Sequence, residues 1–231
     1  MNRGVFNIKP VIDELTSSRL KQLLIKLSKN IRLQDEMPEP LKNIMGVDVA
    51  YKDERALTVG VLFSWPELKH QSTFHRIDRV FFPYIPTLLS FREGNLIIRF
   101  LKNLSLKPDL LMVNAHGVAH PFRCGCASYI GLLTDTPTIG VAKKIICGEI
   151  IKSEEGGNIA YLKYYDKIIG AVLNHNKKSR EIVVSPGHRI SLKTAVQITL
   201  TTLKDSRLPI ILEEAHRMAS KLASELFKHT N

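Results

Sequence analysis

The chain has 231 residues, of which 44% are hydrophobic and 24% charged, so it can build a sizeable core. Lys and Arg number 33 against 22 Asp and Glu, which gives a formal net charge of +11 and a pI near 9.6. A balance this basic favours a polyanionic partner, most simply nucleic acid. No apolar run approaches the roughly 18 residues that a membrane helix requires, so we expect no membrane partner.

The cysteines and the first residues indicate a compartment. Cys124, Cys126 and Cys147 are an odd number, and the first two are too close for the C-x-x-C spacing of redox or zinc sites. The opening residues MNRGVFNIKP have no signal-peptide character. We therefore expect free thiols in a reducing cytoplasm. Composition sets no oligomeric state, and a monomer is the simplest expectation.

The N-terminal part reads as a helix followed by a connector. Pro10 suits the first turn of a helix, and apolar residues recur at about 3.6-residue spacing from Val11 to Leu27. The segment QDEMPEP (34–40) is polar and rich in proline, so it should connect rather than fold regularly. Because no linker divides the remainder, we expect one domain over residues 1–231, with residues 1–40 packing on it.

The rest of the chain alternates strands and helices. Strands are predicted at 43–51, 56–65 and 72–82, then a helix at 87–104, a strand at 109–114, a helix at 126–135 and a strand at 137–142. Further strands are predicted at 158–165, 167–174 and 181–185, a helix from the cap Ser191 through 204, and a last helix at 212–229. An antiparallel meander followed by a parallel β-α-β unit predicts a three-layer α/β/α fold with a mixed central sheet.

Asp48 is the first candidate for chemistry. Strand alternation in NIMGVDVAY places Gly46, Asp48 and Ala50 on one face, so a carboxylate lies mid-strand between very small neighbours. A buried carboxylate is costly unless it is paired or binds metal, and the small neighbours leave room for something to approach. The alternative is an Asp on the exposed face of the strand.

The segment FFPYIPTLLSFRE (81–93) is the second candidate. Two prolines stiffen a turn that presents Tyr84 and Ile85, a device suited to pushing between bases, although a Tyr facing the core is an equal alternative. Glu93 follows Arg92 inside an apolar helix. A second buried acid near Asp48 would suit Mg²⁺, which prefers oxygen ligands and substrate phosphates.

Further candidate residues lie at or just after the ends of two predicted apolar strands. Asn114 ends an apolar strand, where it could serve chemistry or cap the next turn. His116 and His120 are four apart, but Gly117 and Pro121 argue against a helix and so against zinc. Lys143, with Lys144 beside it, follows another apolar strand and could face a phosphate or only solvent.

His188 and Arg189 form the last candidate pair. Pro186-Gly187 predicts a turn, which places both residues before the helix capped by Ser191. A His and an Arg at a helix entrance suit an anion or a leaving group, although this signal alone is weak.

In this order the segments resemble the endonuclease V family, the deoxyinosine 3′ endonucleases. The resemblance rests on GVDVAY (46–51), PYIPTLLSFRE (83–93), AHGVAHP (115–121), PTIGVAKK (137–144), SPGHRISL (185–192) and SRLPIILEEAHRMA (206–219). It covers about residues 40 to 220, and the proline-bracketed Tyr with its downstream F-R-E is highly specific. It implies an RNase H-like fold and Mg²⁺- or Mn²⁺-dependent DNA repair by cleavage of the second phosphodiester 3′ of inosine in DNA, and in some members in RNA.

The resemblance also implies roles for individual residues. Asp48 and Glu93 match the acidic metal ligands, and Lys143 and His188 match residues near the scissile phosphate. Substrate contacts are implied for the wedge Tyr84-Ile85-Pro86, for Arg92 and for His120, a motif histidine in the loop after the third metal position. In this reading Lys143 stabilises charge on the phosphate, and His188 assists the water or the leaving oxygen.

One departure from the family pattern concerns the third metal ligand. The family has D-G-x-G where this chain has Asn114-Ala115-His116-Gly117, so a neutral amide replaces the third acid and Ala115 adds a Cβ to the turn. Three readings follow: a weaker or manganese-preferring nuclease, a binder of inosine-containing nucleic acid that does not cut, or a substitution that traps substrate. Another RNase H-like nuclease, such as a junction-cleaving enzyme, is a further alternative.

Overall fold

The structure, a computed structural model, describes residues 12–152, 158–174, 181–204 and 206–228. Its helices are α1 (Glu14–Ser28), α2 (Asn95–Lys102), α3 (Cys126–Thr134), α4 (Leu192–Thr202) and α5 (Ile210–Leu226), with a π-helical turn η1 (Ser90–Gly94) before α2. Its strands are β1 (Asn43–Lys52), β2 (Arg55–Ser64), β3 (His70–Arg79), β4 (Leu110–Val113), β5 (Thr138–Ala142), β6 (Glu149–Lys152), β7 (Ile159–Tyr164), β8 (Lys167–Leu173) and β9 (Ile182–His188). The predicted helix start at Pro10 and Val11 lies outside the described residues. No helix in the described part of the chain is both long enough and apolar enough to cross a membrane.

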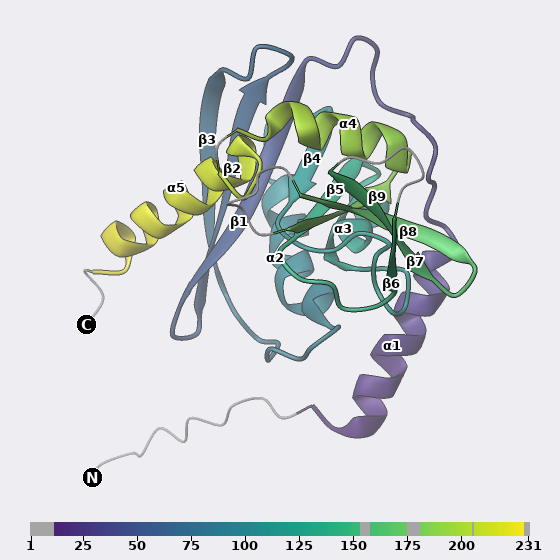
Figure 1. Cartoon of the computed structure of the whole chain (residues 1–231). Coiled ribbons are helices and arrows are strands. Elements are labelled where there is room, and N and C mark those ends of the chain that lie inside the picture. Colours follow the sequence, from purple (N-terminus) through teal and green to yellow (C-terminus); the bar gives the residue numbers. More distant parts are fainter. Residues whose placement is uncertain (1–11, 153–157, 175–180, 205, 229–231) are drawn as a thin grey trace.

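The strands form one mixed sheet in the order β3-β2-β1-β4-β5-β9-β8-β7-β6. β1, β2 and β3 are the predicted antiparallel meander, and β4 and β5 run parallel to β1 as the β-α-β unit required. Figure 1 shows α4 and α5 lying over the sheet, with α2 and α3 behind it. The three-layer α/β/α architecture with a mixed sheet is thus confirmed.

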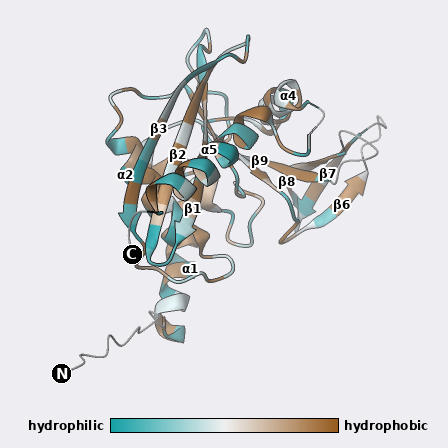
Figure 2. Ribbon diagram, turned by 90° about the vertical axis from the view of Figure 1, so that its left-hand side faces the viewer, coloured by the Kyte–Doolittle hydropathy of each residue, from teal (hydrophilic) through white to brown (hydrophobic). Residues whose placement is uncertain are grey.

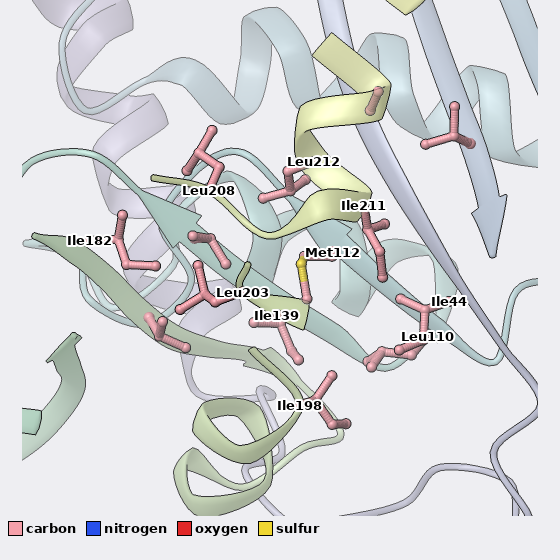
Figure 3. Close-up of a cluster of buried hydrophobic side chains, with 14 of the residues drawn as sticks. Ile44, Leu110, Met112, Ile139, Ile182, Ile198, Leu203, Leu208, Ile211 and Leu212 are labelled. Atoms are coloured by element: carbon pink, nitrogen blue, oxygen red, sulfur yellow. The ribbon is translucent and has the colours of Figure 1, made fainter. Parts of the chain in front are cut away.

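Two hydrophobic clusters hold the layers together, one on each face of the sheet. The first joins β1, β4, β5 and β9 to α4 and α5, and Figure 3 shows its members Ile44, Leu110, Met112, Ile139, Ile182, Ile198, Leu203, Leu208, Ile211 and Leu212. The second joins the opposite faces of β1 and β4 to α1, α2 and α3 through residues such as Leu24, Val47 and Phe100. In Figure 2, α5 carries both hydrophilic and hydrophobic residues, as expected of a helix with one buried face.

Three local predictions need correction. The helix expected at 87–104 begins only at Ser90, and its first turn is π-helical. β6 was not predicted, because a four-residue edge strand with a half-exposed Ile150 carries little pattern. Pro186-Gly187 is not a turn but part of β9. The register of β9 against β5 shifts there, and a Cβ on Gly187 would lie 2.2 Å from Thr138 Oγ1, so the same residues that favour a turn here form a bulge.

The connector between α1 and β1 is tied to the far end of β9. Arg189 donates to the Glu36 carboxylate at 3.2 Å and to Asp135 at 3.1 Å, and the Asp35 carboxylate accepts from the Ser191 amide at 2.7 Å. Ser191 caps α4 as predicted, since its hydroxyl accepts from the Thr194 amide. These contacts hold the connector at the end of β9 that lies away from the site described next.

Candidate active site

Asp48 and Asn114 occupy neighbouring positions on adjacent strands. β1 and β4 are parallel, and Val47 pairs with Val113, so Asp48 and Asn114 are the next residues on each chain. β4 ends at this point whereas β1 continues to Lys52, so Asp48 has no β4 partner beside it. The carboxyl end of β4 therefore lies next to the Asp48 carboxylate. In α/β folds, ligands bind at the carboxyl ends of the strands.

The small residues beside Asp48 accommodate a helix. A Cβ on Gly46 would lie 2.5 Å from the Ile211 carbonyl oxygen, so only glycine allows α5 to approach β1 this closely. This contact brings His216, further along α5, to the carboxylate: its Nδ1 lies 2.7 Å from Asp48 Oδ2. The Asp48 side chain is 16% exposed and that of His216 is 61% exposed. The imidazole therefore orients an almost buried acid and still faces solvent.

Glu93 approaches Asp48 from the other layer. It lies in η1, and its carboxylate accepts a hydrogen bond from the Tyr51 hydroxyl at 3.2 Å. Burial raises the pKa of Glu93 to about 7; the Tyr51 bond opposes that rise, and the negative charge of Asp48 adds to it. The two carboxylates are thus close enough to repel each other. A π-helical turn is a frequent feature of functional sites, and here it carries the second acid.

The donor set suits a divalent cation with few protein ligands. Among the described residues, no group of three or more His, Cys, Asp and Glu side chains is arranged as a metal site. Asp48 and Glu93 nevertheless offer two mutually repelling carboxylates, and Asn114 beside them can offer a neutral oxygen. Mg²⁺ commonly binds through one or two carboxylates and completes its shell with water and substrate phosphate, so these residues fit it.

A cavity of about 310 Å³ lies beside these residues. Four predicted site residues line it together, namely Tyr84, Asn114, His120 and Lys143. The remaining lining residues are Thr87, Leu89, Ser90, Ala115, His116, Cys126, Ala142, Lys144 and Ile146. A larger cavity of about 580 Å³, between the ends of α2 and α3, contains none of the predicted site residues.

The proline-bracketed loop is held firmly at the mouth of this cavity. Tyr84 points outward with 69% exposure, whereas Ile85 is partly buried and packs against the hydrophobic cluster on the α2 side, so Tyr84 is the more exposed of the two loop side chains. Pro86 is exposed. Arg92 donates to the Phe82 carbonyl at 2.6 Å and stacks on the Tyr51 ring at 4.5 Å, so it anchors the loop from beneath.

The two loop histidines also have backbone partners. His120 Nε2 lies 3.1 Å from the Thr87 carbonyl and its Nδ1 accepts from the Phe122 amide, which fixes it as the Nε2–H tautomer. Burial lowers the pKa of His120 to about 4, so it stays neutral near pH 7. His116 Nε2 lies 2.8 Å from the Lys144 carbonyl. Each histidine therefore ties two walls of the cavity together.

His188 and Arg189 are not part of this constellation. His188 lies beside Thr138 at the start of β5, whereas Lys143 directly follows the end of β5, so the two residues are at opposite ends of this strand. His188 is 2% exposed, and its Nδ1 accepts from the Arg32 amide at 3.3 Å. Arg189 is occupied by Glu36 and Asp135. Both residues anchor the connector and lie away from the group formed by Asp48, Glu93 and Asn114.

The structure adds His216 to the site, which the residue-by-residue reading missed. It lies within the family-like segment SRLPIILEEAHRMA (206–219), but a single histidine on an amphipathic helix has no distinguishing spacing. The structure also removes a concern about Ala115: its backbone is outside the positive-φ region, and its side chain is 5% exposed in the cluster on the α2 side. Asn114 is therefore the change in this turn that bears on chemistry.

Comparison with known proteins gives a consistent result. The family described as Endonuclease V matches residues 25–217. Endonuclease V of Thermofilum pendens is 35% identical over 212 residues, covering 91% of this chain and 90% of that protein. The crystal structure of endonuclease V from Streptomyces avermitilis has a TM-score of 0.82 at 29% identity, covering 95% and 96% of the two chains.

A complex in the same group holds nucleic acid. Endonuclease V of Ciona intestinalis, with a 24mer DNA containing an inosine followed by a ribo-adenosine, has a TM-score of 0.83 at 26% identity, covering 92% of this chain and 100% of that one. These likenesses agree with the RNase H-like fold, and they extend across the elements that carry Asp48, Glu93 and Asn114. By sequence and by structure, this chain belongs to the endonuclease V family of phosphodiester-hydrolysing nucleases.

Proposed function

We propose that this protein is a Mg²⁺- or Mn²⁺-dependent repair endonuclease. Its substrate would be deoxyinosine-containing DNA, and inosine-containing RNA as a second substrate, cut at the second phosphodiester 3′ of the lesion. The observation that carries the proposal is the position of Asp48, Glu93 and Asn114 beside a cavity that Asn114 shares with Tyr84 and Lys143. The Ciona protein, which is similar along nearly the whole chain, is seen with inosine-containing DNA.

Each residue contributes a distinct function to the reaction. Asp48, Glu93 and Asn114 would hold the cation, which when bound supplies positive charge for the phosphate and makes water more acidic. Asp48 is kept in orientation by His216. Lys143 is exposed at the cavity wall, and its backbone carbonyl accepts from Arg207 at 2.7 Å, which fixes the start of its loop. Its ammonium group balances the charge that grows on the phosphate as water adds and the leaving oxygen departs.

The cavity and its loop would select the base. A base-flipping enzyme removes its target from the stack and reads it in a pocket, and a rigid side chain fills or props the gap. Tyr84 stands exposed at the cavity mouth on a loop fixed by two prolines, Arg92 and His120. The chain's charge of +11 supplies sequence-independent attraction to the nucleic-acid backbone.

A second candidate function is inosine binding without cleavage. It is favoured by the amide of Asn114, which gives the cation one negative charge less than a third acid would. In that case the basic surface, Tyr84 and the cavity would retain inosine-containing DNA on a gel, and added metal would produce no cut.

Cleavage of a single-inosine duplex distinguishes these functions. The test compares the chain with Asp48→Ala and with Asp53→Asn, a change at an exposed turn residue whose left-handed backbone Asn tolerates. We expect the unchanged chain to cut the second bond 3′ of inosine with Mg²⁺ or Mn²⁺, and not to cut a control duplex that has adenine in place of inosine. Asp48→Ala should still bind the inosine duplex but should not cleave it. Loss of both binding and folding in Asp48→Ala would argue against its metal role. A matched inosine RNA tests the second substrate.

A further inference from the structure

The loop that leads into the cavity presents a second exposed aromatic ring. Phe81 is 70% exposed, almost the same as Tyr84 at 69%, and only two residues separate them. Single exposed apolar residues are common and need no explanation, but two large rings on one short loop beside a cavity form a local pattern. An exposed Phe forgoes the hydrophobic stabilisation that burial of its ring would contribute.

The exposure of Phe81 is imposed by a fixed backbone. The Val80 amide donates to the Glu54 carbonyl at 2.7 Å, and the Phe82 carbonyl accepts from Arg92 at 2.6 Å, so the residues on both sides of Phe81 are tied down. Phe82 turns inward, where its ring centroid lies 5.8 Å from that of Phe91. Because Val80 and Phe82 are both held in place and the Phe82 ring points inward, the Phe81 ring remains exposed to solvent.

The rest of the loop repeats this alternation. After Tyr84 points outward, Ile85 packs inward against the same cluster as Phe82. The Thr87 carbonyl is then bound by His120 from the cavity wall. The two most exposed large hydrophobic side chains of the loop, Phe81 and Tyr84, are therefore both aromatic, while Phe82 and Ile85 pack inward.

We propose that Phe81 stacks on a nucleobase next to the one that enters the cavity, as a second ring beside Tyr84. The inference rests on the proposed function, since it requires a base to leave the stack. Extrusion uncovers apolar base faces, and an exposed aromatic ring recognises them through stacking regardless of base identity. The face belongs either to a neighbour in the inosine strand or to the base opposite inosine, and the chemistry is the same for both.

The test measures binding without divalent metal to three probes: single-stranded DNA with one inosine, the corresponding duplex, and that duplex with an abasic site opposite inosine. Variants are Phe81→Ala, Phe81→Leu and Phe81→Trp, with Tyr165→Ala as the matched control because it removes a ring that is 80% exposed on the β7–β8 turn. Thermal melting checks that each variant is folded.

We expect Phe81→Ala to weaken binding about 5- to 100-fold, the range for loss of one base–aromatic stack. Phe81→Leu should lose nearly as much, Phe81→Trp should bind like the unchanged chain, and Tyr165→Ala should bind normally. A loss on the single strand assigns the stacked base to the inosine strand. A loss confined to the fully paired duplex assigns it to the opposite base.

Two results would overturn the inference while leaving the proposed function intact. One is binding of inosine DNA by Phe81→Ala within twofold of the unchanged chain on all three probes. The other is an equal loss on inosine-free DNA, because stacking beside an extruded base cannot occur there. If the unchanged chain shows no preference for inosine over adenine, the proposed function fails and this inference fails with it.

Discussion

His216 Nδ1 lies 2.7 Å from Asp48 Oδ2, and this contact joins α5 to the centre of the site. A residue that orients a metal-ligating carboxylate typically affects metal affinity or activity by about 10- to 100-fold when it is removed. We therefore expect His216→Ala to raise the Mg²⁺ concentration needed for half-maximal cleavage by that range with an unchanged melting temperature. His216→Asn, which keeps an N–H donor, should recover part of the loss.

Arg217→Ala is the control for that prediction. Arg217 has the same side-chain exposure as His216, 61%, and its ion pair is with Glu214 on its own helix. It should titrate with Mg²⁺ like the unchanged chain. If His216→Ala instead melts early and loses activity at every metal concentration, the histidine acts only in packing.

Asn114→Asp should strengthen metal binding and cleavage. The change adds a negative charge next to Asp48 in a site that already has two carboxylates, so it helps only when a cation is present. We expect faster cleavage in Mg²⁺ and a smaller advantage of Mn²⁺ over Mg²⁺, measured as single-turnover rates. Ala115→Gly in the same turn should change little, because Ala115 already has an ordinary backbone. Cleavage by the aspartate variant alone would show that the natural chain is a binder.

Glu93 makes the metal-free protein sensitive to pH. Its pKa rises on folding from 4.5 to about 7, so the folded state holds a proton that the unfolded state loses, and stability falls as pH rises through that window. Glu93→Gln keeps an acceptor for Tyr51 and removes the cost, about 3 kcal/mol for a shift of this size. In chelator its melting temperature should match the unchanged chain at pH 4.5 and exceed it by several degrees at pH 8.

Two further measurements test the cause of that pH effect. Tyr51→Phe removes the hydrogen bond that lowers the pKa of Glu93, so it should carry the pH-dependent loss to higher pH. Added Mg²⁺ should favour the charged carboxylate and reverse the loss in the unchanged chain. A melting difference between Glu93→Gln and the unchanged chain that does not vary with pH would contradict the assignment.

Thr87→Gly should stabilise the fold. Thr87 has φ of 68°, a left-handed backbone that costs a β-branched residue about 1–2 kcal/mol relative to glycine. Glycine loses more entropy on folding, about 0.4–1 kcal/mol, so a modest net gain remains. The carbonyl that binds His120 is retained. Differential scanning calorimetry should show a melting temperature a few degrees higher for Thr87→Gly. The control Thr201→Gly, at an exposed position in a helix, should lower the melting temperature. A lower melting temperature for Thr87→Gly would show that the Thr87 side chain makes a stabilising contact.

Local patterns along the chain are sufficient to predict the layer architecture and most of the site. Apolar periodicity specified strands β1 to β5 and helices α3 to α5, because burial of one face dictates spacing along the chain. The mid-strand position of Asp48, the proline bracket around Tyr84 and the acid in FRE are local patterns, and the structure brings all three to one region. The replacement of an acid by the amide Asn114 is also evident from the sequence alone.

Which distant residues meet depends instead on how the layers pack. Gly46 lets α5 approach β1, and this close contact rather than any spacing places His216 on Asp48. At Gly187 a one-residue bulge takes the place of the expected turn, and the antiparallel pairing of β9 with β5 places His188 at the end of β5 away from Lys143. Neither outcome follows from local propensity, because both depend on which backbone atoms lie across a packed layer, and that is set by the whole sheet and its helices.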